Sequence, residues 1–258
     1  TATASTADPL LSAQADAEAA GLKALASSTL TGSLSSAKVA LVVLPGASDD
    51  DVTAIRSTLT DAGASVIGRV TLTDNWQSTS MSQYRTTLST TLASHLASGA
   101  AKTASADGVV GYSIVQVLTT TGAETDLLRQ ILTDESTPIM TVDEDANGGA
   151  TAIVAVGPRA QATAVSNATP AAATHSSDAW VGLGQALGST NGVLVGDAST
   201  RDAMISQVRA NGVTVTTVDS VGTTLAAVDT ALALSTPATG ARAFGVGNGA
   251  QSVIPSNK

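Results

Sequence analysis

Three glycines near the end of the sequence have the spacing of a phosphate-binding loop. Gly245, Gly247 and Gly249 follow a short apolar run in the segment ARAFGVGNGAQSVIP. Such a loop binds a dinucleotide when a strand precedes it, a helix opens from it and an acidic residue follows about 20 positions later. Only residues 250–258 follow here, with Pro255 among them, so we expect no helix N-terminus to supply free N–H groups. We therefore predict a glycine-rich terminal strand and turn lying close against a sheet, with no bound cofactor.

Side chains that bind transition metals are scarce. The sequence has no Cys, three Met and two His, whereas such metals are held chiefly by thiolate, thioether and imidazole groups. His95 and His175 have no ligand spacing with each other, and we expect both to be structural or solvated. Met81 could share a helical face with His95, whereas Met140 and Met204 lie in apolar stretches and are expected to fill the core.

Patterns for other chemistry are weak. The sequence contains no G-x-S-x-G segment, and its two histidines offer few candidates for a Ser–His–Asp arrangement. We therefore do not expect an enzyme. The carboxylate clusters Asp49–Asp51 and Asp143–Asp145 could bind a hard cation such as calcium. Helix-capping charge for the first cluster and a solvated loop for the second are the favoured interpretations.

Short loops of small residues mark a candidate ligand crevice. In a doubly wound sheet a ligand binds outside the carboxyl ends of the strands, near the point where the strand order reverses. Arg159 and Arg201 are the basic residues near these loops, and the acidic residues there argue against a phosphate ligand. The residues assigned to the crevice are Pro45, Gly46, Gly157, Pro158, Gly196 and Asp197.

Strands and helices alternate along the chain and position these loops. The apolar run 38–46 is typical of a strand covered on both faces, Ser48 can cap a helix over 49–63, and a strand is predicted over 64–74. A second strand–helix–strand unit recurs over residues 191–220. The recurrence predicts an α/β fold: a Rossmann-like or flavodoxin-like, doubly wound, mostly parallel sheet with flanking helices.

The remaining segments complete this organisation. Asp8 and Pro9 can open a helix that runs to residue 30. We predict an N-terminal helix in residues 1–30 and a single α/β domain in residues 31–258. Further predictions are helical regions at 81–97, 108–132 and 222–235, strands at 137–145 and 151–158, and a surface loop at 159–177 before a helix that carries Trp180.

Composition excludes several classes of partner. Hydrophobic residues make up 43% of the 258 residues, enough for a core, but aromatic residues make up only 2%. A net charge of −9 with only 12 Lys and Arg argues against nucleic acid as a partner. No stretch approaches the roughly 20 apolar residues that span a bilayer, so we expect this chain itself to be soluble. The opening TATASTADP, which lacks a methionine, is typical of a cut or processed N-terminus, and we expect an export or anchoring segment upstream of it.

Two segments carry a family resemblance. SSAKVALVVLPGASDDDVTAIRSTLTDAGASVIGRVTLTD resembles the opening of the globular part of the actinobacterial MctB family, the mycobacterial copper transport protein B group. FGVGNGAQSVIP is similar to the C-terminal signature of that family. The resemblance covers Leu30 to Pro255. It implies that a hydrophobic segment and a coiled coil precede this part, and that the helix before Thr31 is a remnant of that coiled coil.

The resemblance also implies a function. Family members are described as cell-envelope proteins that limit copper accumulation, with an outer-membrane channel role proposed. We therefore expect a non-enzymatic protein of copper homeostasis, periplasmic or outer-membrane associated, attached to the membrane through a segment absent from this chain. The scarcity of soft ligands predicts no dedicated copper site in this domain, so transport would require a homo-oligomer, the missing segment or a partner. The alternatives are a ligand-binding α/β module without catalytic residues and a scaffold that binds only protein.

Overall fold

The computed structural model describes residues 8–161 and 174–256. In this part of the chain, a seven-stranded sheet has the order β3-β2-β1-β4-β5-β6-β7. Neighbouring strands are parallel except β2 and β3, which are antiparallel. The predicted doubly wound, mostly parallel sheet is confirmed, and its order is the Rossmann order. The strands are β1 (Lys38–Val43), β2 (Ser65–Leu72), β3 (Met140–Glu144), β4 (Ala152–Val156), β5 (Asn191–Val195), β6 (Thr216–Val218) and β7 (Arg242–Phe244).

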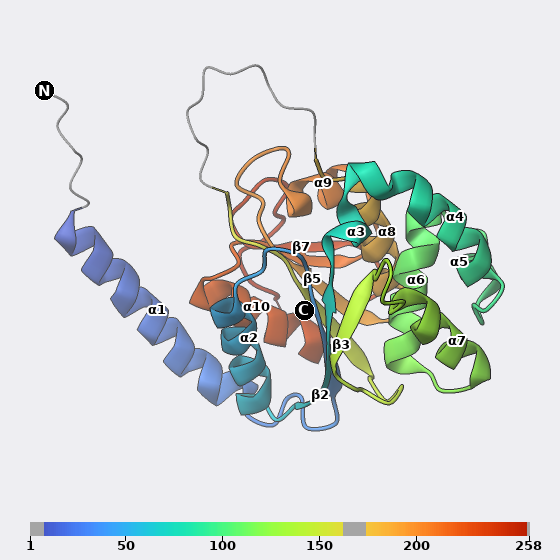
Figure 1. Cartoon of the computed structure of the whole chain (residues 1–258). Helices are drawn as coiled ribbons and strands as arrows, with labels where there is room; N and C mark the ends of the chain where they lie inside the picture. The colour runs from blue at the N-terminus through green and yellow to red at the C-terminus, as the bar shows by residue number, and fades with distance from the viewer. Residues whose placement is uncertain (1–7, 162–173, 257–258) are drawn as a thin grey trace, which may run out of the picture.

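Helices cover both faces of the sheet (Figure 1). Strand β1 shows why there are two cores, because Val39 and Leu41 pack on one face and Ala40 and Val42 on the other, all fully buried. The first face carries α1 (Pro9–Leu30), α2 (Asp49–Asp61) and α10 (Thr224–Ser235). The second face carries α3 (Asp74–Gln77), α4 (Ser82–Ala93), α5 (Gly99–Lys102), α6 (Ala106–Thr119), α7 (Ala123–Leu132), α8 (Ser177–Gly188) and α9 (Met204–Ala210), with the 3-10 helix η1 (Thr79–Met81) before α4.

The N-terminal helix α1 stands partly away from the rest of the molecule (Figure 1). It begins as predicted at Asp8, whose side chain accepts a 2.9 Å hydrogen bond from the Leu10 N–H, with Pro9 in the first turn. Ala26 and Leu30 near its C-terminal end are buried. The division into a helix through residue 30 and a separate domain from residue 31 stays a prediction.

Two predicted segments differ from the structure or fall outside it. The single helical region at 108–132 is two helices, α6 and α7, because Gly122 between them has a φ of +134°, which a right-handed helix does not accommodate. The predicted surface loop at 159–177 lies largely outside the described residues, since residues 162–173 are not described. The helix predicted after it is α8.

Candidate functional site at the carboxyl edge of the sheet

The loops assigned to the ligand crevice meet at one edge of the sheet. Pro45-Gly46, Gly157-Pro158 and Gly196-Asp197 follow β1, β4 and β5, which are neighbours in the sheet. Backbone hydrogen bonds continue the pairing beyond the strands, from Leu44 N–H to Val156 O at 2.9 Å and from Gly157 N–H to Val195 O at 2.8 Å. The strand order reverses between β1 and β4, which is where doubly wound folds bind ligands.

Two of these glycines are needed for packing of the chain against itself. A Cβ on Gly157 or on Gly196 would lie 2.6 Å from the Cε atom of Met204 in α9. Met204 is buried, as is Met140, so the prediction that both methionines fill the core is confirmed. The small residues at these two positions therefore admit a methionine side chain rather than a ligand.

An ion pair crosses the point where the strand order reverses. Asp51, in the first turn of α2, is buried and accepts hydrogen bonds of 2.8 and 2.6 Å from Arg159, which follows β4. The Arg159 side chain is 56% exposed. The hydrogen bond to Asp51 raises the pKa of the guanidinium above its ordinary value. Because Asp51 already neutralises it, Arg159 has reduced capacity to bind an anion at this edge.

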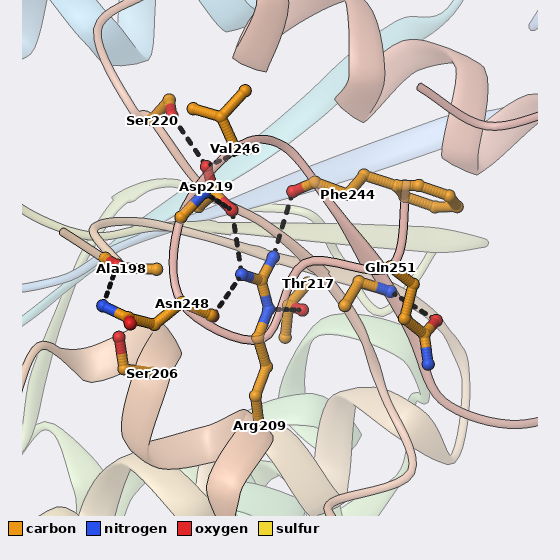
Figure 2. A network of polar contacts seen from close by, with 12 residues as sticks. Ala198, Ser206, Arg209, Thr217, Asp219, Ser220, Phe244, Val246, Asn248 and Gln251 are labelled. Carbon is orange, nitrogen blue, oxygen red and sulfur yellow. Dashed lines mark hydrogen bonds and ion pairs between the residues drawn. The ribbon is translucent and has the colours of Figure 1, made fainter. Parts of the chain in front are cut away.

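The glycine-rich loop after β7 binds a carboxylate of this same chain (Figure 2). The N–H groups of Val246 and Gly247 donate to the two oxygens of Asp219 at 2.9 and 3.0 Å. The Ser220 hydroxyl donates to the same carboxylate at 2.7 Å, and Arg209 donates to it at 2.8 Å. Burial alone would raise the pKa of Asp219, but these hydrogen bonds lower it below the ordinary value. The donors that would bind a phosphate in a nucleotide loop are thus used by Asp219.

Arg209 of α9 holds the loop from the other side (Figure 2). Besides Asp219, its guanidinium donates to the backbone oxygens of Asn248 at 2.9 Å and Phe244 at 3.0 Å, and to the Thr217 hydroxyl at 2.9 Å. The side chains of Arg209 and Asp219 are 7% and 1% exposed. A planar guanidinium with several satisfied donors suits such a buried position.

Glycine is required in this loop for steric reasons. Gly245 has a φ of +127°, and a Cβ there would overlap the carboxylate of Asp219. A Cβ on Gly247 would lie 2.7 Å from the Cβ and 2.8 Å from the backbone oxygen of Ala198. Through residue 256 the structure describes no helix after β7. The prediction of a terminal strand and turn lying close against the sheet is confirmed.

An open pocket of about 470 Å³ lies beside this loop. Its polar groups are already engaged: Asp197 accepts from Ser199 N–H at 2.9 Å and from the Ser199 hydroxyl at 3.0 Å, and Asn248 donates twice to Ala198 O at 2.8 Å. Of the six crevice residues, Asp197 contributes to this pocket. It is lined by Asp197, Ala198, Ser199, Asp219, Ser220, Val246, Gly247 and Asn248. Such an acidic wall is unsuited to a phosphate and could attract a cation.

The histidines and Met81 are not gathered into a metal site. His95 follows α4 and contacts Glu124 through Nδ1, while His175 is exposed and forms an isolated bridge with Ser78. The expectation that Met81 and His95 could share a helical face is wrong, because Met81 ends η1 before α4 and His95 lies beyond its last residue. Within residues 8–161 and 174–256, no three His, Cys, Asp or Glu side chains are grouped to hold a metal ion.

The two carboxylate clusters are engaged in ion pairs. Asp49–Asp51 lies in the first turn of α2, as predicted for helix-capping charge. Asp143 and Glu144 lie in the edge strand β3, which confirms the strand predicted within 137–145 and shows that the solvated loop predicted for Asp143–Asp145 is wrong for these two residues. Arg56 donates to Glu144 at 2.7 and 3.0 Å, and Arg129 donates to Asp145 at 2.7 and 2.6 Å. The antiparallel pairing of β3 with β2 sets Arg69 opposite Glu144, and the Arg69 Nε atom lies 3.4 Å from Asp143.

Arg209 and Asp219 are candidate functional residues that the sequence alone did not single out. The predicted helix and strand of the second unit contained both, and Asp219 stood at the carboxyl end of its strand. That placement alone does not reveal that a loop 26 residues later would close over it.

A family model described as "Copper transport outer membrane protein, MctB" matches residues 2–255. The chain belongs to the MctB family. Both segments that carried the resemblance lie inside the matched range, so that interpretation is confirmed. In a comparison with curated proteins, none matches the chain. Within the described ranges, no helix combines the length and the hydrophobicity needed to cross a bilayer.

Proposed function

We propose that this MctB family chain is a non-enzymatic protein of the cell envelope that takes part in copper transport or homeostasis, limiting copper accumulation, and that it acts as a homo-oligomer. The observation that carries the copper role is the family match, which spans residues 2–255. The lack of a G-x-S-x-G segment in the sequence and the internal pairing of Asp219 and Arg209 support the non-enzymatic part.

The available ligands support a role through assembly rather than through a copper site of this domain. The chain has no Cys, and Met140 and Met204 are buried in the core. His95 is engaged with Glu124. Copper prefers sulfur and imidazole ligands, which are therefore not gathered in the part of the chain that the structure describes. In competition with a chromogenic copper(I) chelator of known affinity, we expect the chelator to keep the metal, and withdrawal of one equivalent by the chain would overturn this part.

The exposed face of α1 supports self-association. Leu10, Leu11 and Leu25 are 63%, 64% and 71% exposed on this 22-residue helix. Most of a helix's stability in a protein comes from burying an apolar face, and residues 9–18 of α1 are all exposed in the described part of the chain. A second copy of the same helix would cover these leucines.

Size-exclusion chromatography with light scattering tests the oligomer. We expect the wild-type chain to be larger than a monomer and the variant L11E/L25E to be a monomer. L127E is the matched control, because Leu127 is also exposed but lies on α7. A monomeric wild-type chain, or equal dissociation of both variants, contradicts self-association through α1.

The open pocket beside Asp197 favours a second candidate, a ligand-binding module of the envelope. Thermal-shift screening against copper, calcium, nucleotides and sugars distinguishes a ligand-binding module from a protein that acts through assembly. A reproducible shift with one compound that is lost in D197N supports ligand binding, and no shift with any compound argues for assembly.

A further inference from the structure

Helix α10 contains a buried carboxylate with no hydrogen-bond partner among the residues that the structure describes. Asp229 is completely buried, and among the described residues neither of its side-chain oxygens has a hydrogen-bond partner. The residues around it in the helix are small or apolar, among them Val228, Ala226 and Ala233. A buried carboxylate without a partner is costly when it is ionised and much less so when it is neutral.

Helix α10, which carries Asp229, lies between the sheet and two other helices. Helix α10 packs on β5 and β6 of the sheet and is covered by α1 and α2. Between these three helices is a cavity of about 250 Å³, with Ala26 of α1, Ile55 of α2 and Ala227 of α10 in its walls. Since α1 is attached to the domain chiefly by packing on α10, a change in α10 affects the attachment of α1.

The charged groups on the surrounding elements are engaged elsewhere or exposed. Lys23 of α1 and Asp61 of α2 are exposed. Asp51 of α2 is paired with Arg159, and strand β5 contributes no ionisable side chain.

The charged groups on the sheet side of α10 also have partners of their own. Asp219, directly after β6, is paired with Arg209. Arg242 of β7 donates to the carbonyl oxygens of Ala233 at 3.1 Å and Thr236 at 2.7 Å, near the C-terminal end of α10. None of these described cations is bonded to Asp229. Burial, followed by the negative charge of Asp219, raises the pKa of Asp229 to about 7.

We propose that Asp229 is a proton-sensitive switch that sets how firmly α10, and with it α1, packs on the sheet. The neutral acid is compatible with the apolar surroundings and keeps α10 in place. The ionised carboxylate gains water when α10 separates from the sheet, so opening is favoured as the proton is lost. The inference concerns the docking of α10 and stands independently of the copper role.

The expected effect follows from proton linkage. The acid titrates at about 7 when buried and at 3.8 when unperturbed. Local opening that hydrates Asp229 is therefore expected to become about 30-fold more favourable between about pH 5.5 and about pH 8. The effect grows up to about pH 7, because the closed form retains the proton there while the open form has already lost it, and it levels off above that pH as the closed form ionises too.

Hydrogen exchange of the full chain, measured by mass spectrometry and corrected for the intrinsic pH dependence, tests the switch. In the wild type we expect protection of α10 and the C-terminal half of α1 to fall about 30-fold over this range. The variant D229N cannot ionise and is expected to show a flat profile. D61N, whose carboxylate is exposed and lines the cavity between α1, α2 and α10, serves as the control and should follow the wild type. A wild-type profile that is flat, or matched by D229N, overturns the proposal.

If D229N does not fold, carboxyl ¹³C resonances of the wild-type aspartates give a direct test. One resonance should titrate with a midpoint near 7. Completion of every aspartate titration below about pH 5 overturns the proposal.

Discussion

Replacing Asp219 by Asn is the sharpest perturbation of the glycine-rich loop. Asp219 accepts from Arg209, Ser220 and the N–H groups of Val246 and Gly247. Asn has the same shape, but one of its two polar groups is a donor that faces N–H or hydroxyl donors. The variant D219N therefore loses at least one hydrogen bond and leaves the Arg209 charge buried without a counter-ion.

The size of the effect follows from the burial of this pair. With side chains 7% and 1% exposed, solvent does not screen the Arg209–Asp219 pair. Removing one partner of a buried pair costs about 3–5 kcal/mol. Since a domain's whole stability is about 5–15 kcal/mol, D219N should lose a large part of it.

Urea denaturation at neutral pH, followed by circular dichroism, measures the free energy of unfolding. D197N is the matched control, because Asp197 lines the same pocket and, among the described residues, its carboxylate accepts from Ser199 alone, and we expect it to cost about 1 kcal/mol. In the double variant R209M/D219N the unpaired charge is absent, so its loss should be smaller than the sum of the two single losses. If D219N costs no more than D197N, the account of the loop is refuted.

Three further results are expected. G247A should lose about 1–3 kcal/mol in urea denaturation, because its Cβ would overlap Ala198, whereas G99A, with nothing near its Cβ, should be neutral or slightly stabilised; equal effects would contradict the packing argument. Arg129 lowers the pKa of Asp145 from 3.8 to about 2, so this carboxylate contributes stability above the unfolded value that is lost as pH falls through the folded one. Thermal melts between pH 6 and pH 2 should show a smaller fall in melting temperature at acid pH for D145N than for the wild type. Because the pair is partly exposed, the substitution should cost about 1 kcal/mol or less at neutral pH. An equal fall in both proteins would contradict this. In thermal-shift assays, ATP and NAD should leave the wild-type melting temperature unchanged, because Asp219 uses the loop's N–H donors, and a clear rise would contradict it.

The sheet could be predicted because its signals are local. The apolar run that forms β1, the acidic first turn of α2 and the glycine that ends it each reflect the conformation of a few neighbouring residues. The loops after β1, β4 and β5 then meet at one edge because parallel strands share their direction. The meeting of these three loops at one edge therefore followed from topology, whereas a ligand crevice there stays a prediction.

The side-chain contacts at this edge of the sheet could not be predicted, because they join residues from different elements of the fold. Nothing in the sequence near Gly157 or Gly196 indicates that Met204 fills the space beside them. The partners of Asp219 come from α9 and from the loop after β7, and a single sequence does not specify which arginine reaches which carboxylate. Asp229 lies in the apolar helix α10, and the sequence pattern predicts this helix whether or not position 229 carries an ionisable side chain.

Copper content in cells tests the central claim most directly. Cells that lack this protein should accumulate more copper than the parent strain when grown in added copper, as measured by elemental mass spectrometry of washed cells. Reintroducing the wild-type protein should restore the parental copper content, and the L11E/L25E form at an equal cellular level should not. Equal copper in the deletion and parent strains would contradict a copper role for this member of the MctB family.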